Sequence, residues 1–135
     1  ELKNQMGEAV HLSDFRGKKV VLYFYPKTSN PEAYMKTILF QAHLDKYKNA
    51  GVEIVEISCD PVETQKKFAD LNHVTFNLLS DPEKKITKFF GIHSEDKYQT
   101  RTIIVDEDGI VRKVYQPTSI LYENDQINRF IGIKS

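Results

Sequence analysis

The sequence predicts an α/β protein with a central mixed β-sheet flanked by helices. Short apolar segments, which are typical of strands, alternate with segments that open with a capping residue and a proline, as helices do. Near the end, two strand-like segments follow each other with only a turn between them, which indicates an antiparallel hairpin. At 135 residues and 40% hydrophobic content, the chain has the size of one domain with its own core. We therefore expect a single domain over residues 1–135.

The predicted strands differ in how clearly they are marked. In chain order they are Ala9–Leu12, which is the weakest, Lys19–Tyr25, Val52–Ser58, Arg101–Asp106 and Gly109–Tyr115. The second is almost continuously apolar, as expected of a strand that is buried on both faces, whereas the third alternates. The last two flank the turn Asp-Glu-Asp-Gly, whose glycine can adopt the positive φ of a hairpin turn.

Three helices are expected to begin in the same way, with a capping residue, a proline and a nearby glutamate. Their starts are Asn30-Pro31, Asp60-Pro61 with capping-box spacing to Glu63, and Asp81-Pro82. Proline is favoured at the first helical position, where its missing N–H costs nothing. We expect the first helix to reach about Asn49 before Gly51, the third to end at Gly91, and a last helix to cover Glu123–Ile131. Strands alternating with helices in this order describe a thioredoxin-like fold.

Composition excludes several classes of function. Lys+Arg and Asp+Glu both number 19, so the formal net charge is zero and nothing indicates a nucleic-acid partner. No apolar run approaches the ~20 residues of a membrane span, and the first residues do not resemble a signal peptide. The four histidines show no metal-ligand spacing, and one cysteine, Cys59, allows neither an internal disulfide nor a zinc cluster. We expect no cofactor, no metal and a reducing compartment such as the cytoplasm.

Five segments together resemble the Q-type peroxiredoxins, the bacterioferritin comigratory protein branch of the AhpC/TSA family. They are His11–Lys18, Val20–Lys27, Ile57–Asp60, Leu78–Asp81 and Arg101–Asp106. Their spacing matches the family over nearly the whole chain, and only the family's usual opening segment has no counterpart. The resemblance implies a thioredoxin-like fold, a hydroperoxide substrate, a thioredoxin-like thiol donor, and a monomer or homodimer.

The resemblance also locates the family's reactive site. Peroxiredoxins reduce hydroperoxides with a cysteine in a Pro-x-x-x-Thr-x-x-Cys motif, at the first turn of the helix after the central strand. Here the motif begins at Pro26, the threonine position holds Asn30, and the cysteine position holds Ala33. The family's distant arginine matches Arg101. The chain as written therefore lacks the nucleophile of the family's reaction.

Three further positions of the same helix depart from the family pattern. Tyr34 replaces a threonine or proline, Lys36 replaces a glutamate, and Ile38 stands where many Q-type members carry a resolving cysteine. Loss of one cysteine does not explain the other changes, although some active members also vary at these flanking positions.

The expected electrostatics of position 33 follow from its place in the helix. With Asn30 as cap, position 33 would lie beside unpaired backbone N–H groups, which together with the helix dipole would lower the pKa of a cysteine there. Arg101 would add a permanent positive charge near Ala33, and Pro26 would form one wall of the pocket. The structural alternatives are that Asn30 is only a cap and that Arg101 is a strand-edge cation paired with Asp106 or Glu107.

Cys59 follows the strand Val52–Ser58 and has two interpretations. A lone cysteine after an apolar strand is usually buried and inert. The alternative is a thiol near the pocket, because adjacent parallel strands end on the same side, and the helix that follows would then acidify it.

Three functions remain open from the sequence. The first is a thiol-dependent peroxidase whose peroxidatic cysteine has been changed to alanine by engineering. The second is a natural non-catalytic binding or interaction protein on a peroxiredoxin scaffold. The third is an enzyme that uses Cys59 instead. A methyl group has no lone pair and no reducible state, so Ala33 itself cannot attack a peroxide.

Overall fold

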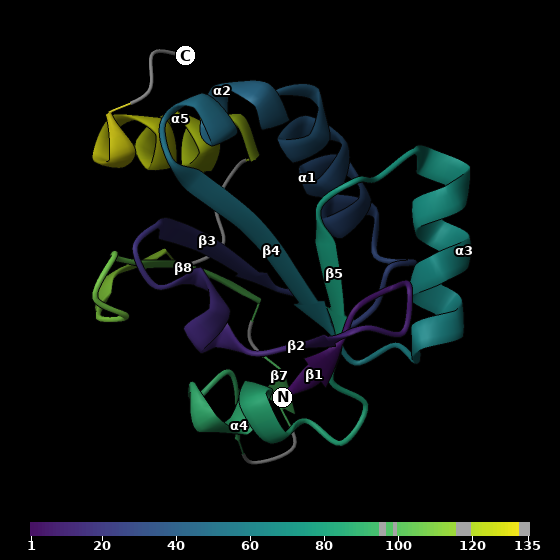
Figure 1. The fold of residues 1–135 in the computed structure, drawn as a ribbon. Coiled ribbons are helices and arrows are strands. Elements are labelled where there is room, and N and C mark those ends of the chain that lie inside the picture. Colours follow the sequence, from purple (N-terminus) through teal and green to yellow (C-terminus); the bar gives the residue numbers. More distant parts are fainter. Residues whose placement is uncertain (95–96, 99, 116–119, 133–135) are drawn as a thin grey trace.

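The computed structural model describes residues 1–94, 97–98, 100–115 and 120–132, which form a mixed sheet with helices on both faces (Figure 1). The sheet has seven strands in the order β2-β1-β5-β4-β3-β8-β9. The strands are β1 (Leu2–Lys3), β2 (Ala9–Val10), β3 (Lys19–Phe24), β4 (Val52–Ser58), β5 (Asn77–Ser80), β8 (Arg101–Val105) and β9 (Val111–Tyr115). A separate hairpin joins β6 (His93–Ser94) to β7 (Lys97–Tyr98). The helices are the 3-10 turn η1 (Leu12–Phe15), α1 (Pro31–Ala42), α2 (Leu44–Asn49), α3 (Val62–Asn72), α4 (Lys85–Phe89) and α5 (Ile120–Ile131).

The pairing of the strands confirms the predicted mixed sheet. β3, β4 and β5 are parallel neighbours, whereas β8 pairs with β3 and β9 in antiparallel fashion. The predicted hairpin is present. Gly109 takes φ 80° in its turn, and the Asp106 carboxylate accepts the backbone N–H groups of Asp108 and Ile110 at 2.9 and 3.0 Å.

Each face of the sheet carries its own apolar core, because successive residues of a strand point to opposite faces. Tyr23 of β3 and Tyr25, directly after this strand, face α1, α2, α3 and α5, where they pack in one cluster with Phe40 and Ile127. On the other face Phe24 packs in a cluster with residues of η1 and α4. Figure 1 shows α1, α2 and α5 gathered on one side and α4 on the other.

Several predicted boundaries are wrong. The first helix does not continue to Asn49 but breaks at His43, whose φ of −111° and ψ of 16° leave the helical region, so α2 is a separate turn. β8 ends at Val105 because Asp106 already belongs to the turn. The strands β1 and β5 were not predicted, since both are too short to show a period.

Two of the three predicted helix starts are also wrong. Asp60 does not cap α3, because the Asp60 carboxylate accepts the backbone N–H of Thr28 at 2.7 Å instead. α3 starts after Pro61 without a side-chain cap. Pro82 does not open a helix. Asp81 reaches over a turn to the N–H groups of Lys85 and Thr87 at 2.9 and 2.8 Å, so α4 begins only at Lys85.

The end of α3 carries backbone strain that a substitution can relieve. His73 is exposed and takes φ 56° and ψ 41°, a left-handed conformation that glycine adopts without a steric penalty. We expect His73→Gly to raise the free energy of unfolding by about 0.5–1 kcal/mol, as measured by urea denaturation. His73→Ala removes the same imidazole but keeps the Cβ, and it should give no gain. Equal gains from both variants would contradict backbone strain as the cause.

Candidate active site

The segment matching the family motif follows β3 and leads into α1. Cys59, directly after β4, donates its backbone N–H to the carbonyl oxygen of Pro26 at 3.2 Å. The parallel strands β3 and β4 therefore end side by side, as the sequence predicted. Pro26 and Asn30 precede α1, and Ala33 lies in its first turn.

Asn30 is confirmed as the cap of α1, and this contradicts one part of the predicted electrostatics of position 33. Its Oδ1 accepts the backbone N–H groups of Glu32 and Ala33 at 2.9 and 3.1 Å, and its carbonyl oxygen accepts that of Tyr34 at 2.9 Å. The expectation of unpaired N–H groups beside position 33 is thus wrong. The donors that would stabilise an anion there are already used by the cap itself.

Ala33 is part of the core. Its side chain is 1% exposed and belongs to the apolar cluster of Tyr25 and Phe40. Its carbonyl oxygen accepts the Thr37 hydroxyl at 2.9 Å. Position 33 therefore offers neither a reactive atom nor an open path for a solvent-borne substrate.

Arg101 lies at the start of β8, directly opposite Phe24 of β3 in the sheet. It is half-buried, and its Nη1 donates to the carbonyl oxygen of Thr100 at 2.8 Å. The Asp106 carboxylate, one of the two partners considered for Arg101, pairs with the Arg112 guanidinium at 2.6 Å. That Arg101 faces Ala33 across a pocket walled by Pro26 stays a prediction.

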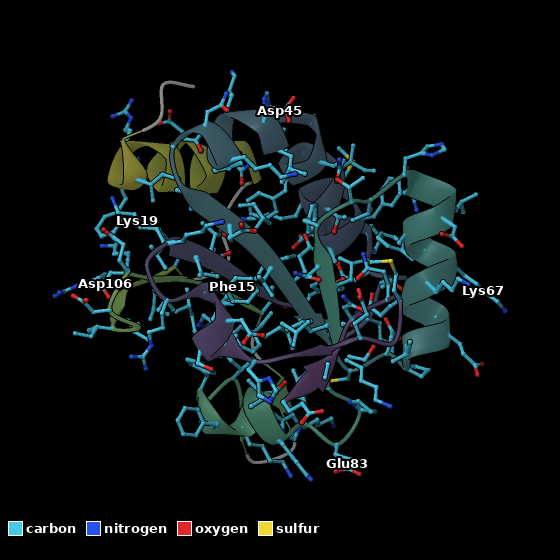
Figure 2. All side chains as sticks on the ribbon, in the orientation of Figure 1. Phe15, Lys19, Asp45, Lys67, Glu83 and Asp106 are labelled. Carbon is cyan, nitrogen blue, oxygen red and sulfur yellow. The ribbon has the colours of Figure 1, made fainter. Side chains whose placement is uncertain are left out.

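The departures at positions 34 and 36 have different structural consequences. Tyr34 is half-exposed, and its ring meets Phe68 of α3 edge-on at a centroid distance of 6.2 Å. Lys36 points inward and forms a buried ion pair with Glu123 of α5. Charged side chains such as Asp45, Lys67 and Glu83 extend outward from the fold (Figure 2), whereas the side chains of Lys36 and Glu123 are only 3% and 7% exposed.

The surroundings of Lys36 are built to hold a charge. Its Nζ lies 5.2 Å from the Tyr23 ring centroid and 5.5 Å from that of Phe40, within cation–π range. Thr102 of β8 donates its hydroxyl to the same Glu123 carboxyl oxygen at 2.5 Å. Burial lowers the pKa of Lys36, and the Glu123 carboxylate opposes that shift. The pair ties α1 to α5 and, through Thr102, to the sheet.

A second carboxyl group lies in the same core. Glu56 of β4 is fully buried, and its Oε1 is 2.6 Å from the Thr37 hydroxyl. Burial raises the pKa of Glu56 to about 8, while Thr37, Tyr25 and Lys36 act in the opposite direction. Neither Glu56 nor Glu123 was predicted as a site residue from the sequence. The period of two in β4 was a usable signal, because it places Glu56 on the same face as Val52 and Ile54.

Cys59 is half-buried rather than fully buried. Burial is the largest cause that raises the pKa of its thiol. Asp81 and Asp60 add to the rise, and Lys84 opposes it. The expected acidification by the following helix is therefore wrong, since the net shift is upward.

The raised pKa gives a direct prediction for Cys59. We expect iodoacetamide to alkylate Cys59 at pH 7 more slowly than it alkylates glutathione, because a smaller fraction of the thiol is ionised and the residue is half-buried. Mass spectrometry of the intact chain over time measures this rate, with the urea-unfolded chain as the control for full exposure. Alkylation of the folded chain faster than glutathione would contradict the prediction.

The described residues lack two features that would point to other functions. No three His, Cys, Asp or Glu side chains there are grouped so that they could hold a metal ion. Nor does that part of the chain contain a helix with the length and apolar character needed to cross a membrane.

Comparisons with known proteins agree on one family. The AhpC/TSA family matches residues 1–114. Peroxiredoxin Bcp of Escherichia coli is 33% identical over 122 residues, which cover 84% of this chain and 78% of that protein. The chloroplastic peroxiredoxin Q of Triticum aestivum is 40% identical over 118 residues, 84% of this chain but only 54% of the relative. The chain thus spans little more than half the length of that plant relative.

Solved structures give the same result at the level of the fold. BcpB from Mycobacterium tuberculosis has a TM-score of 0.89 and 28% sequence identity, with 100% of this chain and 93% of that chain covered. Peroxiredoxin Q from Xanthomonas campestris has a TM-score of 0.90 and covers 97% of this chain and 88% of its own, but at 23% identity it supports the fold alone. With the family match over residues 1–114 and the shared architecture, this chain belongs to the AhpC/TSA family and to its Q-type (Bcp) peroxiredoxin branch.

Proposed function

We propose that this chain is a thiol-peroxidase scaffold of the peroxiredoxin Q type that does not reduce hydroperoxides by the family's cysteine mechanism. The observation that carries the proposal is position 33. It holds a methyl group, it is 1% exposed, and its backbone N–H is already bound by the Asn30 cap. A nucleophile, access for the peroxide and free anion-stabilising donors are all required for the reaction. The residues at position 33 and at the cap supply none of them.

A natural non-catalytic binding or interaction protein is favoured over an engineered alanine variant by the Lys36–Glu123 pair. An engineered Cys-to-Ala change accounts for Ala33 alone. It does not account for a lysine whose buried charge is matched by a glutamate 87 residues away. A buried lysine without that carboxylate would be strongly destabilising. Lys36 and Glu123 therefore form a matched pair. This supports natural divergence of several residues around position 33 rather than replacement of the cysteine alone.

The setting of the protein follows from the scaffold. Were a thiol present at position 33, the family resemblance would assign hydroperoxides as oxidants and a thioredoxin-type dithiol as the electron donor. We place the chain in a reducing compartment such as the cytoplasm, because its one cysteine forms no internal disulfide. Its state there is a monomer or a homodimer. Neither a nucleic acid nor a membrane is a partner in this proposal.

A peroxidase assay tests the proposal. The unmodified chain is incubated with hydrogen peroxide and either dithiothreitol or a thioredoxin system, and peroxide consumption is followed. We expect no turnover above the slow reaction of Cys59, and Cys59→Ser should lower that small background without other effect. Sustained turnover in the unmodified chain would overturn the proposal. If Cys59→Ser then abolished it, the reaction would belong to Cys59.

A further inference from the structure

Three ionisable groups share a closed space between the sheet, α1 and α5. They are Glu56 on β4, Lys36 on α1 and Glu123 on α5, with overall exposures of 0%, 2% and 6%. Both carboxyl groups act electrostatically on the single ammonium group. If all three were ionised, one negative charge would remain uncompensated in the core, and such a charge costs several kcal/mol. Charge balance therefore requires one extra proton in this cluster.

Hydrogen-bond geometry indicates which carboxyl group holds that proton. The Thr37 hydroxyl carries one hydrogen, yet its oxygen lies 2.6 Å from Glu56 Oε1 and 2.9 Å from the carbonyl oxygen of Ala33. An ionised Glu56 can only accept, so only one of these two contacts would contain a hydrogen. A protonated Glu56 donates to Thr37, which then donates to Ala33. Both contacts become hydrogen bonds, and 2.6 Å is a normal O–H···O distance.

Glu123 is the better site for the negative charge. Its Oε1 accepts the Lys36 ammonium group and the Thr102 hydroxyl. Glu56 Oε2 has no hydrogen-bond partner in the described part of the chain. The Tyr25 hydroxyl is close enough to Glu56 for each group to shift the pKa of the other, yet neither this hydroxyl nor Glu56 Oε2 makes a well-formed hydrogen bond in the described part of the chain. An oxygen without a donor is tolerated far better in a neutral carboxylic acid than in a carboxylate.

We propose that Glu56 is a buried proton-binding site that works as a pH-sensitive clamp on α1. At neutral pH its acid proton links β4 through Thr37 to the Ala33 carbonyl, and so holds the first turn of α1 against the sheet. In alkaline solution the proton leaves, one hydrogen bond of the chain is lost, and a second negative charge appears in the core. The clamp then releases, and the first turns of α1 open more often.

The ionisable groups around the cluster are consistent with a proton on Glu56. Tyr23 of β3 and Tyr25, directly after it, stay neutral, because burial is the largest cause that raises the pKa of each. The pKa of Lys36 is lowered by burial, yet its ammonium group keeps Glu123 as a counter-charge. Beyond the end of β4, Asp60 adds a negative potential at Tyr25. No positive charge other than Lys36 is among the causes that act on Glu56 within the described part of the chain.

The sign of the pH dependence follows from the raised pKa of Glu56, which is about 8 in the folded chain against an ordinary value of 4.5. Between these values the folded state holds a proton that the unfolded state has lost. The contribution of Glu56 to stability is therefore complete below the pKa of Glu56 in the unfolded chain. It declines as pH rises toward the pKa of Glu56 in the folded chain. In that window Glu56 lowers the folding equilibrium constant by about tenfold for each pH unit.

Glu56→Gln tests the proposal because glutamine is neutral at every pH and its amide can donate to Thr37. Folding equilibrium constants from urea denaturation are compared between pH ~5 and ~9. We expect the ratio of the constants for the unmodified chain and Glu56→Gln to fall by about tenfold per pH unit up to ~8 and then to level off. The control is Glu53→Gln on the same strand, whose side chain pairs with Lys18 at the surface, and its ratio should stay flat. A flat ratio for Glu56→Gln would overturn the proposal.

A second measurement needs no variant. Carbon-13 NMR of the side-chain carboxyl carbons follows each glutamate through a pH titration, and amide hydrogen exchange follows α1. We expect Glu56 to titrate near its folded-state pKa of about 8 and exchange in the first turns of α1 to rise through the same range, beyond the intrinsic effect of pH. Titration of Glu56 near its ordinary value would overturn the proton site. Unchanged protection of α1 while Glu56 titrates in the alkaline range would overturn the clamp.

Discussion

Replacing Lys36 by methionine should lower the free energy of unfolding by about 3–5 kcal/mol, the usual cost of removing one partner of a buried ion pair. Methionine fills a similar volume between the Tyr23 and Phe40 rings, so the packing loss is small. The main cost is electrostatic, because the Glu123 carboxylate stays buried and, among the described residues, keeps the Thr102 hydroxyl as its remaining side-chain donor. Urea denaturation at pH ~7 measures the change.

Two controls separate the buried charge from other effects. The double variant Lys36→Met with Glu123→Gln removes both charges and should recover most of the lost stability. Lys85 forms a pair with Glu83 in which both side chains are more than two-thirds exposed, so Lys85→Met should cost no more than about 1 kcal/mol. A loss from Lys36→Met as small as that from Lys85→Met would contradict a structural role for the pair.

Restoring cysteine at position 33 should not restore peroxidase chemistry. In Ala33→Cys the thiol would lie in an environment that is 1% exposed, beside N–H groups already bound by Asn30. Only an accessible thiolate attacks a peroxide quickly. We therefore expect sulfenic acid to form at the introduced thiol no faster than at an ordinary exposed cysteine. An engineered alanine in an intact peroxidase site predicts the opposite, a rapid reaction.

A matched control is available in the same loop. Ser29 is exposed, so Ser29→Cys presents a thiol a few residues from position 33 without the helix or the core around it. Ala33→Cys and Ser29→Cys are compared in a Cys59→Ser background, with sulfenic acid trapped by dimedone and quantified by mass spectrometry. If the thiol of Ala33→Cys reacted orders of magnitude faster than that of Ser29→Cys, the site would be a working peroxidatic site that has lost only its sulfur.

Much of the fold could be predicted because the strongest patterns are local. The apolar run at β3 and the cap of Asn30 depend on neighbours in sequence, and both are confirmed. The predictions that are wrong concern mainly side chains that have more than one possible hydrogen-bond partner. The carboxylate of Asp60 binds the backbone N–H of Thr28, 32 residues away in sequence, and so does not cap α3. The carboxylate of Asp81 binds N–H groups in the first turn of α4, but that helix begins at Lys85 rather than at Pro82. β5 was missed because four residues are too few to separate strand from helix.

The candidate site, too, could be predicted only in part from the sequence. Motif spacing located Pro26, Asn30 and Ala33 correctly at the end of β3 and the start of α1. It could not reveal what Lys36 does, because the partner Glu123 is 87 residues away and lies beside it only when α5 packs on α1. A residue that departs from a family motif therefore has to be interpreted together with its partner in the folded chain.

The most direct test of the central claim is the pKa of the thiol that Ala33→Cys introduces, from the pH dependence of its alkylation rate in the Cys59→Ser background. Our account predicts a pKa at or above the free value of about 8.5, because burial disfavours the thiolate and the Asn30 cap occupies the donors that would favour it. The Lys36 charge does not change this expectation, since Glu123 neutralises it. A thiol pKa well below the free value would contradict the account and would mean that the electrostatics of a peroxidatic site survive around Ala33.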